Sequence, residues 1–342
     1  MISRVAEHCF WMSRYLERSE NTARVLDVNQ TLLLDFDVPL EQQWKPLLII
    51  SGIHDFPNQA ESEIVQYHMT WDRDNACSIA SSLAAARENA RIIREVISAD
   101  MWEQINHYHL WMQSSDSRRL YDDDRNAFYN QIKRINQIIF GICEGTMSHG
   151  TAWDFFKLGK YLERASQTSR ILDVKYHLIL PSADLVGTPI DIAQWTAILK
   201  SCSGYEPFHK QRQTLDKGTS VADFLIFDPI FPRSILRCLS YCQEANQKIA
   251  ASDTEFSTND VHHIFDNLVD WLHSSTIDDF VTGGLHESLT KVVDTIHDVG
   301  DSIHSTYFDF RMSADGASCN SAKLQALCQN HQPCGLAAFL NH

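Results

Sequence analysis

The chain has 342 residues, 44% of them hydrophobic, and a formal net charge of −15. This acidic balance argues against a general nucleic-acid-binding protein and against a basic protein of membrane surfaces, because both need clustered lysine and arginine. The N-terminal segment lacks the unbroken apolar core of a signal peptide, and no run of eighteen apolar residues predicts a membrane span. We therefore expect a cytoplasmic protein whose nine cysteines, without any C-x-x-C pair, are reduced thiols.

Helical periodicity runs through the chain, and alternating β patterns are nearly absent. Two long helices are predicted at 3–34 and 151–180, ending before Pro39 and Pro181. The other predicted helices span 44–56, 60–69, 78–97, 100–114, 122–149, 189–201, 219–226, 232–251, 259–275 and 284–310. The predicted fold class is all-α, a large helical bundle.

One stretch of sequence occurs twice. Residues 14–28 read R-Y-L-E-R-S-E-N-T-A-R-V-L-D-V, and residues 160–174 read K-Y-L-E-R-A-S-Q-T-S-R-I-L-D-V, at a constant offset of 146. We interpret this repeat as an internal duplication, with pseudo-symmetric halves 1–150 and 151–312 of a single domain, 1–312. Residues 313–342 form an appended tail. A short helix is expected there at 321–329.

The repeat places a polar stripe on each long helix. Arg14, Glu17, Asn21 and Arg24 follow the spacing i, i+3, i+7, i+10. The second copy gives Lys160, Glu163, Gln167 and Arg170. An exposed face with ion pairs along each helix is one interpretation. Apolar residues beside the stripe favour burial instead, and these are Trp11, Val25, Val28, Ile171 and Val174.

We therefore expect the two helices to meet near a pseudo-twofold axis. Glu17 and Glu163 would pair with the cations of both stripes, because an unpaired buried charge is very costly. Those cations are Arg14, Arg24, Lys160 and Arg170. Donors left over would receive a carboxylate or phosphate. Arg18 and Arg164 lie about 100° further round each helix, so they either pair with acids on adjacent helices or join this anion site.

Other candidate residues are weaker. Arg87, Arg91 and Arg94 lie on one face of the predicted helix at 78–97. This face is either exposed, with Arg–Glu pairs along the helix, or part of the anion site. Glu144 and His149 precede the second long helix and are loop residues or site-lining residues.

Metal sites are also considered. Asp294, His297, Asp301 and His304 share one helical face, which is a solvated acidic face or, less favoured, a divalent metal site. In the tail, Cys319, Cys328, His331 and Cys334 match no zinc-ligand spacing. No phosphate-binding glycine loop occurs, so no cofactor is predicted in this chain.

Four stretches together resemble the bacterial alpha-E family, an all-helical group described by a recurrent Glu-Arg motif. They are V-A-E-H-C-F-W-M-S-R-Y-L-E-R-S-E-N-T-A-R (5–24), A-R-E-N-A-R-I-I-R-E-V-I-S-A-D-M-W-E-Q-I-N (86–106), L-G-K-Y-L-E-R-A-S-Q-T-S-R-I-L-D-V-K-Y-H-L-I-L-P (158–181) and F-D-P-I-F-P-R-S-I-L-R-C-L (227–239). Its Glu-Arg pairs here are Glu17-Arg18 and Glu163-Arg164. Lys160 and Ser166 depart from the expected arginine and acid.

The resemblance implies partners. Alpha-E proteins are encoded beside, or fused to, a circularly permuted ATP-grasp protein, often with a transglutaminase-like protein. ATP-grasp enzymes form amide bonds through acyl phosphates, so ATP and Mg²⁺ would be handled by the partner. The resemblance implies a substrate-handling component in the synthesis of a peptide or peptide-like metabolite. The alternatives are a stand-alone enzyme with Glu17 or Glu163 as catalytic acid or base, and a structural, partner-binding helical module. Paired arginines lower a carboxylate pKa, which favours binding over base catalysis.

Overall fold

A computed structural model describes residues 3–35, 43–51, 61–177, 188–211, 218–252 and 259–309. Within these ranges the chain forms helices and short connections and contains no strand, so the predicted all-α class is confirmed. The predicted short helix at 321–329 and the four possible zinc ligands of the tail lie outside the described residues. None of the described helices is long and apolar enough to cross a membrane.

The first half of the chain forms seven of the labelled helices. They are α1 (Ser3–Asp35), α3 (Lys45–Ile50), α4 (Ser62–Thr70), α5 (Ile79–Ile92), α6 (Ala99–Gln113), α7 (Ser115–Asp123) and α8 (Arg125–Thr146). The second half forms α9 (Thr151–His177), α10 (Pro189–Ser201), α11 (Tyr205–Gln211), α12 (Gly218–Phe227), α13 (Ile235–Ser252), α14 (Asn259–Ser274), α15 (Ile277–Thr282), α16 (Leu285–Ile303) and a π-helical turn, His304–Phe308.

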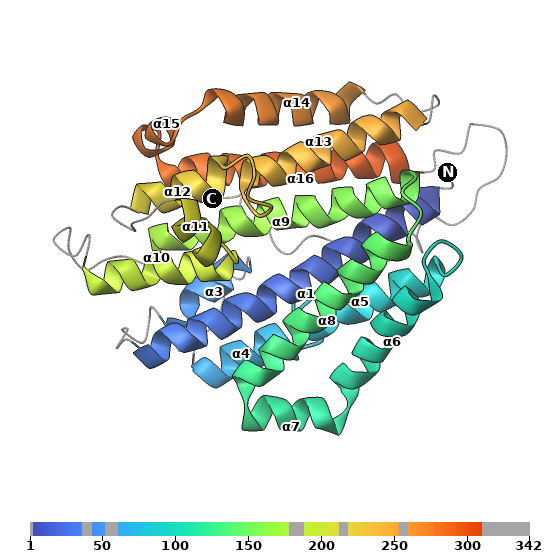
Figure 1. Cartoon of the computed structure of the whole chain (residues 1–342), viewed down its shortest axis with the longest axis horizontal. Coiled ribbons are helices and arrows are strands. Elements are labelled where there is room, and N and C mark those ends of the chain that lie inside the picture. The colour runs from blue at the N-terminus through green and yellow to red at the C-terminus, as the bar shows by residue number, and fades with distance from the viewer. Residues whose placement is uncertain are drawn as a thin grey trace, which may run out of the picture.

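The two long helices α1 and α9 lie side by side through the middle of the molecule (Figure 1). Helices α5 and α8 pack against α1, and α13 and α16 pack against α9. The two halves also exchange neighbours, since α3 packs against α9 and α10 packs against α1. The internal duplication stays an interpretation of the sequence, and the long helices it singles out are the central pair of the fold.

The close approach of α1 and α9 depends on a glycine. A Cβ atom at Gly159 would lie 2.2 Å from the backbone oxygen of Phe10 and 2.4 Å from the hydroxyl of Ser13. Ser13 is the residue 146 positions before Gly159, so small residues stand at corresponding positions of both helices. The helices therefore touch almost backbone to backbone, which brings the polar stripes of both within side-chain reach.

The burial predicted for the repeat helices is confirmed. Residues 12–21 of α1 are all buried, including Arg14, Glu17 and Arg18, as are 162–166 of α9. Of the apolar flanks, Val25, Ile171 and Val174 are buried, whereas Trp11 and Val28 are partly buried. A helix buried on every side must satisfy its charges internally, because water cannot reach them.

Three short helices differ from the sequence predictions. α7 is separate from α8, since Asp124 ends one and caps the next by accepting a hydrogen bond from the Ala127 amide. α15 is a helix of its own with a capping box formed by Thr276 and Asp279. α11 contains Pro207 in its first turn, where a missing amide hydrogen breaks no helical bond.

The cysteines follow the expectation in part. Cys9, Cys143, Cys202, Cys238 and Cys242 are buried free thiols. Burial raises the pKa of Cys202 and Cys238 to about 12, which keeps both thiols protonated and unreactive at neutral pH. Cys77 is disulfide-bonded, so the prediction of reduced thiols throughout is wrong for this residue.

Candidate functional site

The two Glu-Arg pairs form reciprocal ion pairs between α1 and α9. Arg18 donates from Nε and Nη2 to the two carboxylate oxygens of Glu163, at 2.7 and 3.0 Å. Arg164 donates from the same two atoms to Glu17, at 2.7 and 2.8 Å. Each arginine thus holds the glutamate of the other copy in a two-pronged geometry, the strongest form of a carboxylate–guanidinium pair.

Each glutamate has further donors. Arg14 donates to Glu163 at 2.9 Å, and Arg233, from the turn before α13, donates to Glu17 at 3.0 Å. The amides of the two stripes act alike, since Asn21 contacts Glu17 at 3.4 Å and Gln167 contacts Glu163 at 3.3 Å.

A third glutamate completes this set. Glu20 accepts from Arg24 and Arg233. We call this group the ion-pair cluster, and it comprises Arg14, Glu17, Arg18, Glu20, Asn21, Arg24, Glu163, Arg164, Gln167 and Arg233.

Electrostatics fixes the protonation of the cluster. Burial alone would raise the pKa of Glu17, but the neighbouring charges of Arg164 and Arg233 outweigh it and lower that pKa to about 2. Burial and the charges of Arg18 and Arg14 act on Glu163 in the same opposed way, and its pKa is also well below the ordinary value. Both carboxylates are therefore ionised at neutral pH, which suits structural ion pairs and is unfavourable for a general base.

The structure corrects the predicted pairing. Arg14 reaches Glu163 as expected, but Arg24 pairs with Glu20 and not with Glu17 or Glu163. Lys160 and Arg170 form no ion pair with either glutamate. Arg18 and Arg164 do pair with an acid on an adjacent helix, and that acid is the repeat glutamate itself. Arginine is long enough to span this distance because the helices cross so closely at Gly159.

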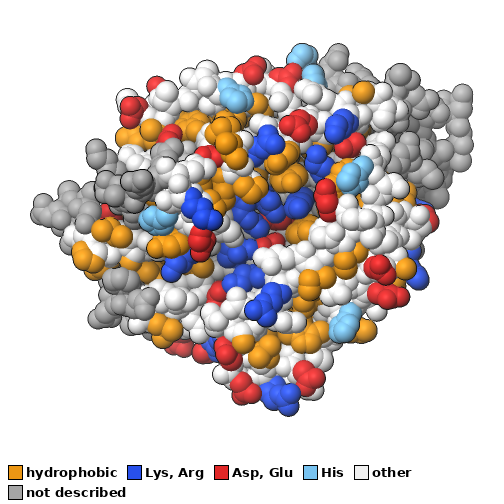
Figure 2. All heavy atoms as spheres, in the orientation of Figure 1, with side chains coloured by type: hydrophobic (Ala, Val, Ile, Leu, Met, Phe, Trp, Pro, Cys, Tyr) orange, Lys and Arg blue, Asp and Glu red, His pale blue; other side chains and the backbone are white. Residues whose placement is uncertain are grey.

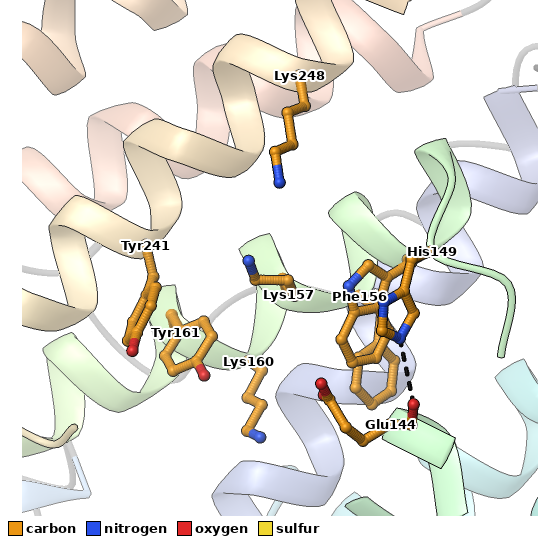
Figure 3. Close-up of a pocket in the computed structure, with 9 residues that line it drawn as sticks. Glu144, His149, Phe156, Lys157, Lys160, Tyr161, Tyr241 and Lys248 are labelled. Carbon is orange, nitrogen blue, oxygen red and sulfur yellow. Dashed lines mark hydrogen bonds between the residues drawn. The ribbon is translucent and has the colours of Figure 1, made fainter. Parts of the chain in front are cut away.

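Beside the cluster lies a basic cavity of about 320 Å³, the lysine cavity (Figure 3). Lys157 and Lys160 come from α9, Lys248 extends toward them from α13, and Glu144 lies at the end of α8. The aromatic and imidazole lining comprises His149, Trp153, Phe156, Tyr161 and Tyr241. Figure 2 shows lysine and arginine side chains gathered at the centre of this face of the molecule, over the middle of α1 and α9.

The walls of the lysine cavity are stacked rings. Tyr161 and Tyr241 lie with centroids 4.5 Å apart, and so do His149 and Trp153. His149 also contacts the backbone oxygen of Glu144 at 3.2 Å. The sequence suggested Glu144 and His149 as loop or site-lining residues, and both line this cavity. The stacked rings form rigid walls, and the charged groups of the three lysines and Glu144 lie between them.

Lys160 is the unusual group of the cavity. Its ammonium lies 4.2 Å from the ring centroid of Phe140 and 5.4 Å from that of Tyr161. Among the described residues it forms no ion pair with a carboxylate. Burial and the nearby charge of Arg164 lower its pKa to about 8. Lys160 is thus a cation at neutral pH, and its surroundings supply too little negative charge to balance it.

Two groups of predicted residues are not brought to either glutamate. Arg87 donates to Asn106 at 2.8 Å, and Arg91 forms an exposed pair with Glu88. This is the exposed Arg–Glu arrangement, and neither arginine lines the lysine cavity. Of the two interpretations of this helix, these contacts favour the exposed one, and a role for Arg87 and Arg91 in an anion site stays a prediction.

The metal alternative on α16 fails as well. His297 lies 3.3 Å from Nη2 of Arg170, and His304 lies 3.8 Å from Asp309. Across the described ranges, no three His, Cys, Asp or Glu side chains gather to hold a metal ion, so Asp294 and Asp301 lack the partners that a site would need.

The sequence did not predict that Arg233, Lys157 and Lys248 belong to the candidate site. Arg233 follows Pro232 in the turn before α13, so no helical spacing links it to Glu17. Its signal was the quoted signature at 227–239, which contains an arginine in a proline-rich turn. Lys157 and Lys248 are 91 residues apart and meet only in the folded chain.

Comparison with known proteins identifies the class to which this all-helical chain belongs. Residues 1–308 match the model of the Alpha-E family, described as a predicted alpha-helical domain with a conserved ER motif. The chain is a member of that family, and Glu17-Arg18 and Glu163-Arg164 are its two Glu-Arg pairs.

Among curated proteins, the chain is 22% identical over 331 residues to uncharacterized proteins of Mycobacterium bovis and Mycobacterium tuberculosis. The match covers 89% of this chain and 36% of each relative, so the chain spans about a third of their length. No solved structure matches.

Proposed function

We propose that this chain is the substrate-handling component of an ATP-grasp-type amide-ligase system that builds or modifies a peptide or peptide-like metabolite in the cytoplasm. It binds an anionic group of the substrate, a carboxylate or an acyl phosphate, in the lysine cavity. Activation by ATP and Mg²⁺ then belongs to a circularly permuted ATP-grasp partner, with a transglutaminase-like protein as a second partner. The link to those partners comes from the family resemblance, and the binding site comes from the charges described above.

One observation carries the proposal, an excess of buried and partly buried cations in an acidic protein. Three carboxylates, Glu17, Glu20 and Glu163, face seven cations. The cations are Arg14, Arg18, Arg24, Lys160, Arg164, Arg170 and Arg233. Elsewhere acids prevail, since the whole chain carries −15. Burying cations without counter-charge is costly, so an anion from outside is the simplest compensation.

In this proposal, such an anion enters the lysine cavity and contacts the uncompensated cations there. In the lining, Lys157, Lys160 and Lys248 supply three ammonium groups and Glu144 supplies the one carboxylate. The buried Asp154 adds a second negative charge near Lys157 and Lys248, which leaves Lys160 as the least compensated of the three. A phosphoryl group with several oxygens suits three point charges that approach from two helices. The hydroxyls of Tyr161 and Tyr241 add two possible donors, and their stacked rings offer a flat wall to an organic group.

A stand-alone enzyme that uses Glu17 or Glu163 as acid or base fits the geometry less well. Glu17 is fully buried, Glu163 is 2% exposed, and arginines occupy the oxygens of both. A substrate would have to displace an arginine to receive or give a proton. The catalytic assignment stays a prediction, and the arrangement favours ion pairs that hold α1 against α9.

Purification from native cells tests the proposal. Tagged wild-type protein and the Lys160→Met variant are isolated side by side, and the co-eluting proteins and small molecules are identified by mass spectrometry. We expect an ATP-grasp protein with both chains and a phosphorylated or carboxylated metabolite with the wild type only. Recovery of neither partner nor anion with the wild type would contradict the proposal. An ATP-grasp protein without a Lys160-dependent metabolite would support association and overturn the binding role.

A further inference from the structure

The two copies of the repeat differ four residues before their last arginine. In the first copy Arg24 pairs with Glu20. At the offset of 146 the second copy has Arg170 and Ser166, so the carboxylate is missing. Arg170 donates instead to the backbone oxygen of Ile50 and contacts Nε2 of His297, both at 3.3 Å. Its buried Nε has no acceptor. The Nε of Arg24 also lacks one, but Arg24 keeps its carboxylate through Nη2.

A small cavity of about 40 Å³ lies at this position, and we call it the Arg170 cavity. Its polar lining includes Arg14, Arg18, Ser166, Gln167, Arg170 and His297. The one carboxylate in the lining is Glu163, which already receives Arg14 and Arg18. Three guanidinium groups therefore share one glutamate, in a space large enough for about three waters or one small anion.

None of the neighbouring acids in the described ranges forms an ion pair with Arg170, whose contacts are with the Ile50 backbone oxygen and His297. The negative charge of Asp294 on α16 acts on the pKa of Arg170, but the two side chains form no ion pair. His297 is a neutral acceptor, because burial and the charge of Arg170 lower its pKa to about 4. Neither group supplies the negative charge that Glu20 supplies to Arg24.

We propose that the Arg170 cavity binds the carboxylate group of a small ligand, which occupies beside Arg170 the place that the Glu20 side chain has beside Arg24. A planar carboxylate matches the fork of a guanidinium group. The small volume excludes a nucleotide. The Arg170 cavity is distinct from the lysine cavity, because α1, α3 and α16 line it together with α9, whereas α8 and α13 line the other. The proposal does not depend on the ATP-grasp partner.

Substitution of Ser166 by glutamate tests this proposal by supplying the carboxylate within the chain. Melting temperature (Tm) is measured in formate, acetate or chloride at equal ionic strength. For the wild type, we expect formate and acetate to raise Tm by about 2 °C or more at saturation. We expect Ser166→Glu to melt higher than the wild type in chloride and to lose the response that comes from the Arg170 cavity. The double variant Ser166→Glu, Lys160→Met should show no response to formate or acetate, because it also lacks the central cation of the lysine cavity. Ser115→Glu, at an exposed position of α7, should keep the wild-type response.

Two outcomes would overturn the proposal: a wild type whose Tm is the same in all three salts, or a Ser166→Glu variant that keeps the full response. If Ser166→Glu does not fold, Arg170→Gln replaces it, and a retained response in that variant has the same meaning. Lys160→Met separates the two sites, since it should keep the acetate response. If Lys160→Met loses the acetate response while Arg170→Gln keeps it, the carboxylate binds in the lysine cavity and this proposal fails alone.

Discussion

The two central helices are alike at their Glu-Arg pairs and different around them. Arg18 and Arg164 use the same atoms to hold the glutamate of the opposite helix. Beyond that core, Arg14 pairs with Glu163, whereas Lys160, its counterpart, leaves Glu17 to Arg233 and lines a cavity. The reciprocal part joins the helices. The differences between the two copies leave Lys160 and Arg170 without a carboxylate partner among the described residues. Lys160 lines the lysine cavity, and Arg170 lines the Arg170 cavity.

The largest effect should come from removing a shared glutamate. Glu17→Gln leaves Arg164 and Arg233 buried without their carboxylate, so we expect the free energy of unfolding to fall by about 3–5 kcal/mol. Urea denaturation followed by circular dichroism measures the change. A loss below about 1 kcal/mol, the range of exposed pairs, would show that the ion-pair cluster does not hold the helices together.

Acid should act on the same pairs. The pKa of Glu17 is about 2 in the folded protein and 4.5 in the reference state, so the unfolded chain takes up its proton first as pH falls. The stability from Glu17 is complete above pH 4.5, and about 3 kcal/mol of it is lost between pH 4.5 and 2. Denaturation in urea at several pH values measures the slope. A slope unchanged in Glu17→Gln would show that other carboxylates cause it.

The helix crossing gives an intermediate effect. Gly159→Ala places a Cβ against the Phe10 backbone, and α1 and α9 must separate, so we expect a loss of about 1–3 kcal/mol. Gly141→Ala is the matched control, because α8 has open space there, and it should gain about 0.5–1 kcal/mol. Chemical denaturation compares the two. Equal effects would mean that the close approach is not required.

Among the substitutions at the candidate site, the smallest stability change is expected at Lys160. Lys160→Met removes a cation that faces Arg164 and Arg233, so the free energy of unfolding should rise by about 1 kcal/mol while pyrophosphate affinity falls about tenfold. Lys45→Met, at an exposed position of α3, should change neither quantity. A Lys160→Met protein that is strongly destabilised would show that the lysine belongs to the structural core.

The sequence predicted the central helices well because each is a long, proline-free segment that keeps apolar residues at helical spacing and ends before a proline, Pro39 or Pro181. The offset of 146 also identified the residues that meet at the centre. It misassigned their partners, since a helical wheel treats one helix alone. At the crossing near Gly159, side chains 100° apart, such as Glu17 and Arg18, both reach α9.

The lysine cavity was beyond prediction for a different reason. Glu144, Lys157 and Lys248 come from three helices, and no spacing connects them before the chain folds. Arg233 was not predicted for a similar reason, since it lies in a turn and no helical spacing links it to Glu17. By contrast, Ser166 was visible as a departure from the repeat, and the structure gives that departure a physical consequence at Arg170.

Isothermal titration of the purified protein with inorganic pyrophosphate, at pH 7 and pH 9, tests most directly whether the excess cations bind an anion. Lys160, with a pKa of about 8, is charged at pH 7 and largely neutral at pH 9. We expect the wild type to bind pyrophosphate at pH 7 and more weakly at pH 9, and Lys160→Met to bind it weakly at both pH values. Absence of binding by the wild type at pH 7, or equal binding by Lys160→Met, would contradict it.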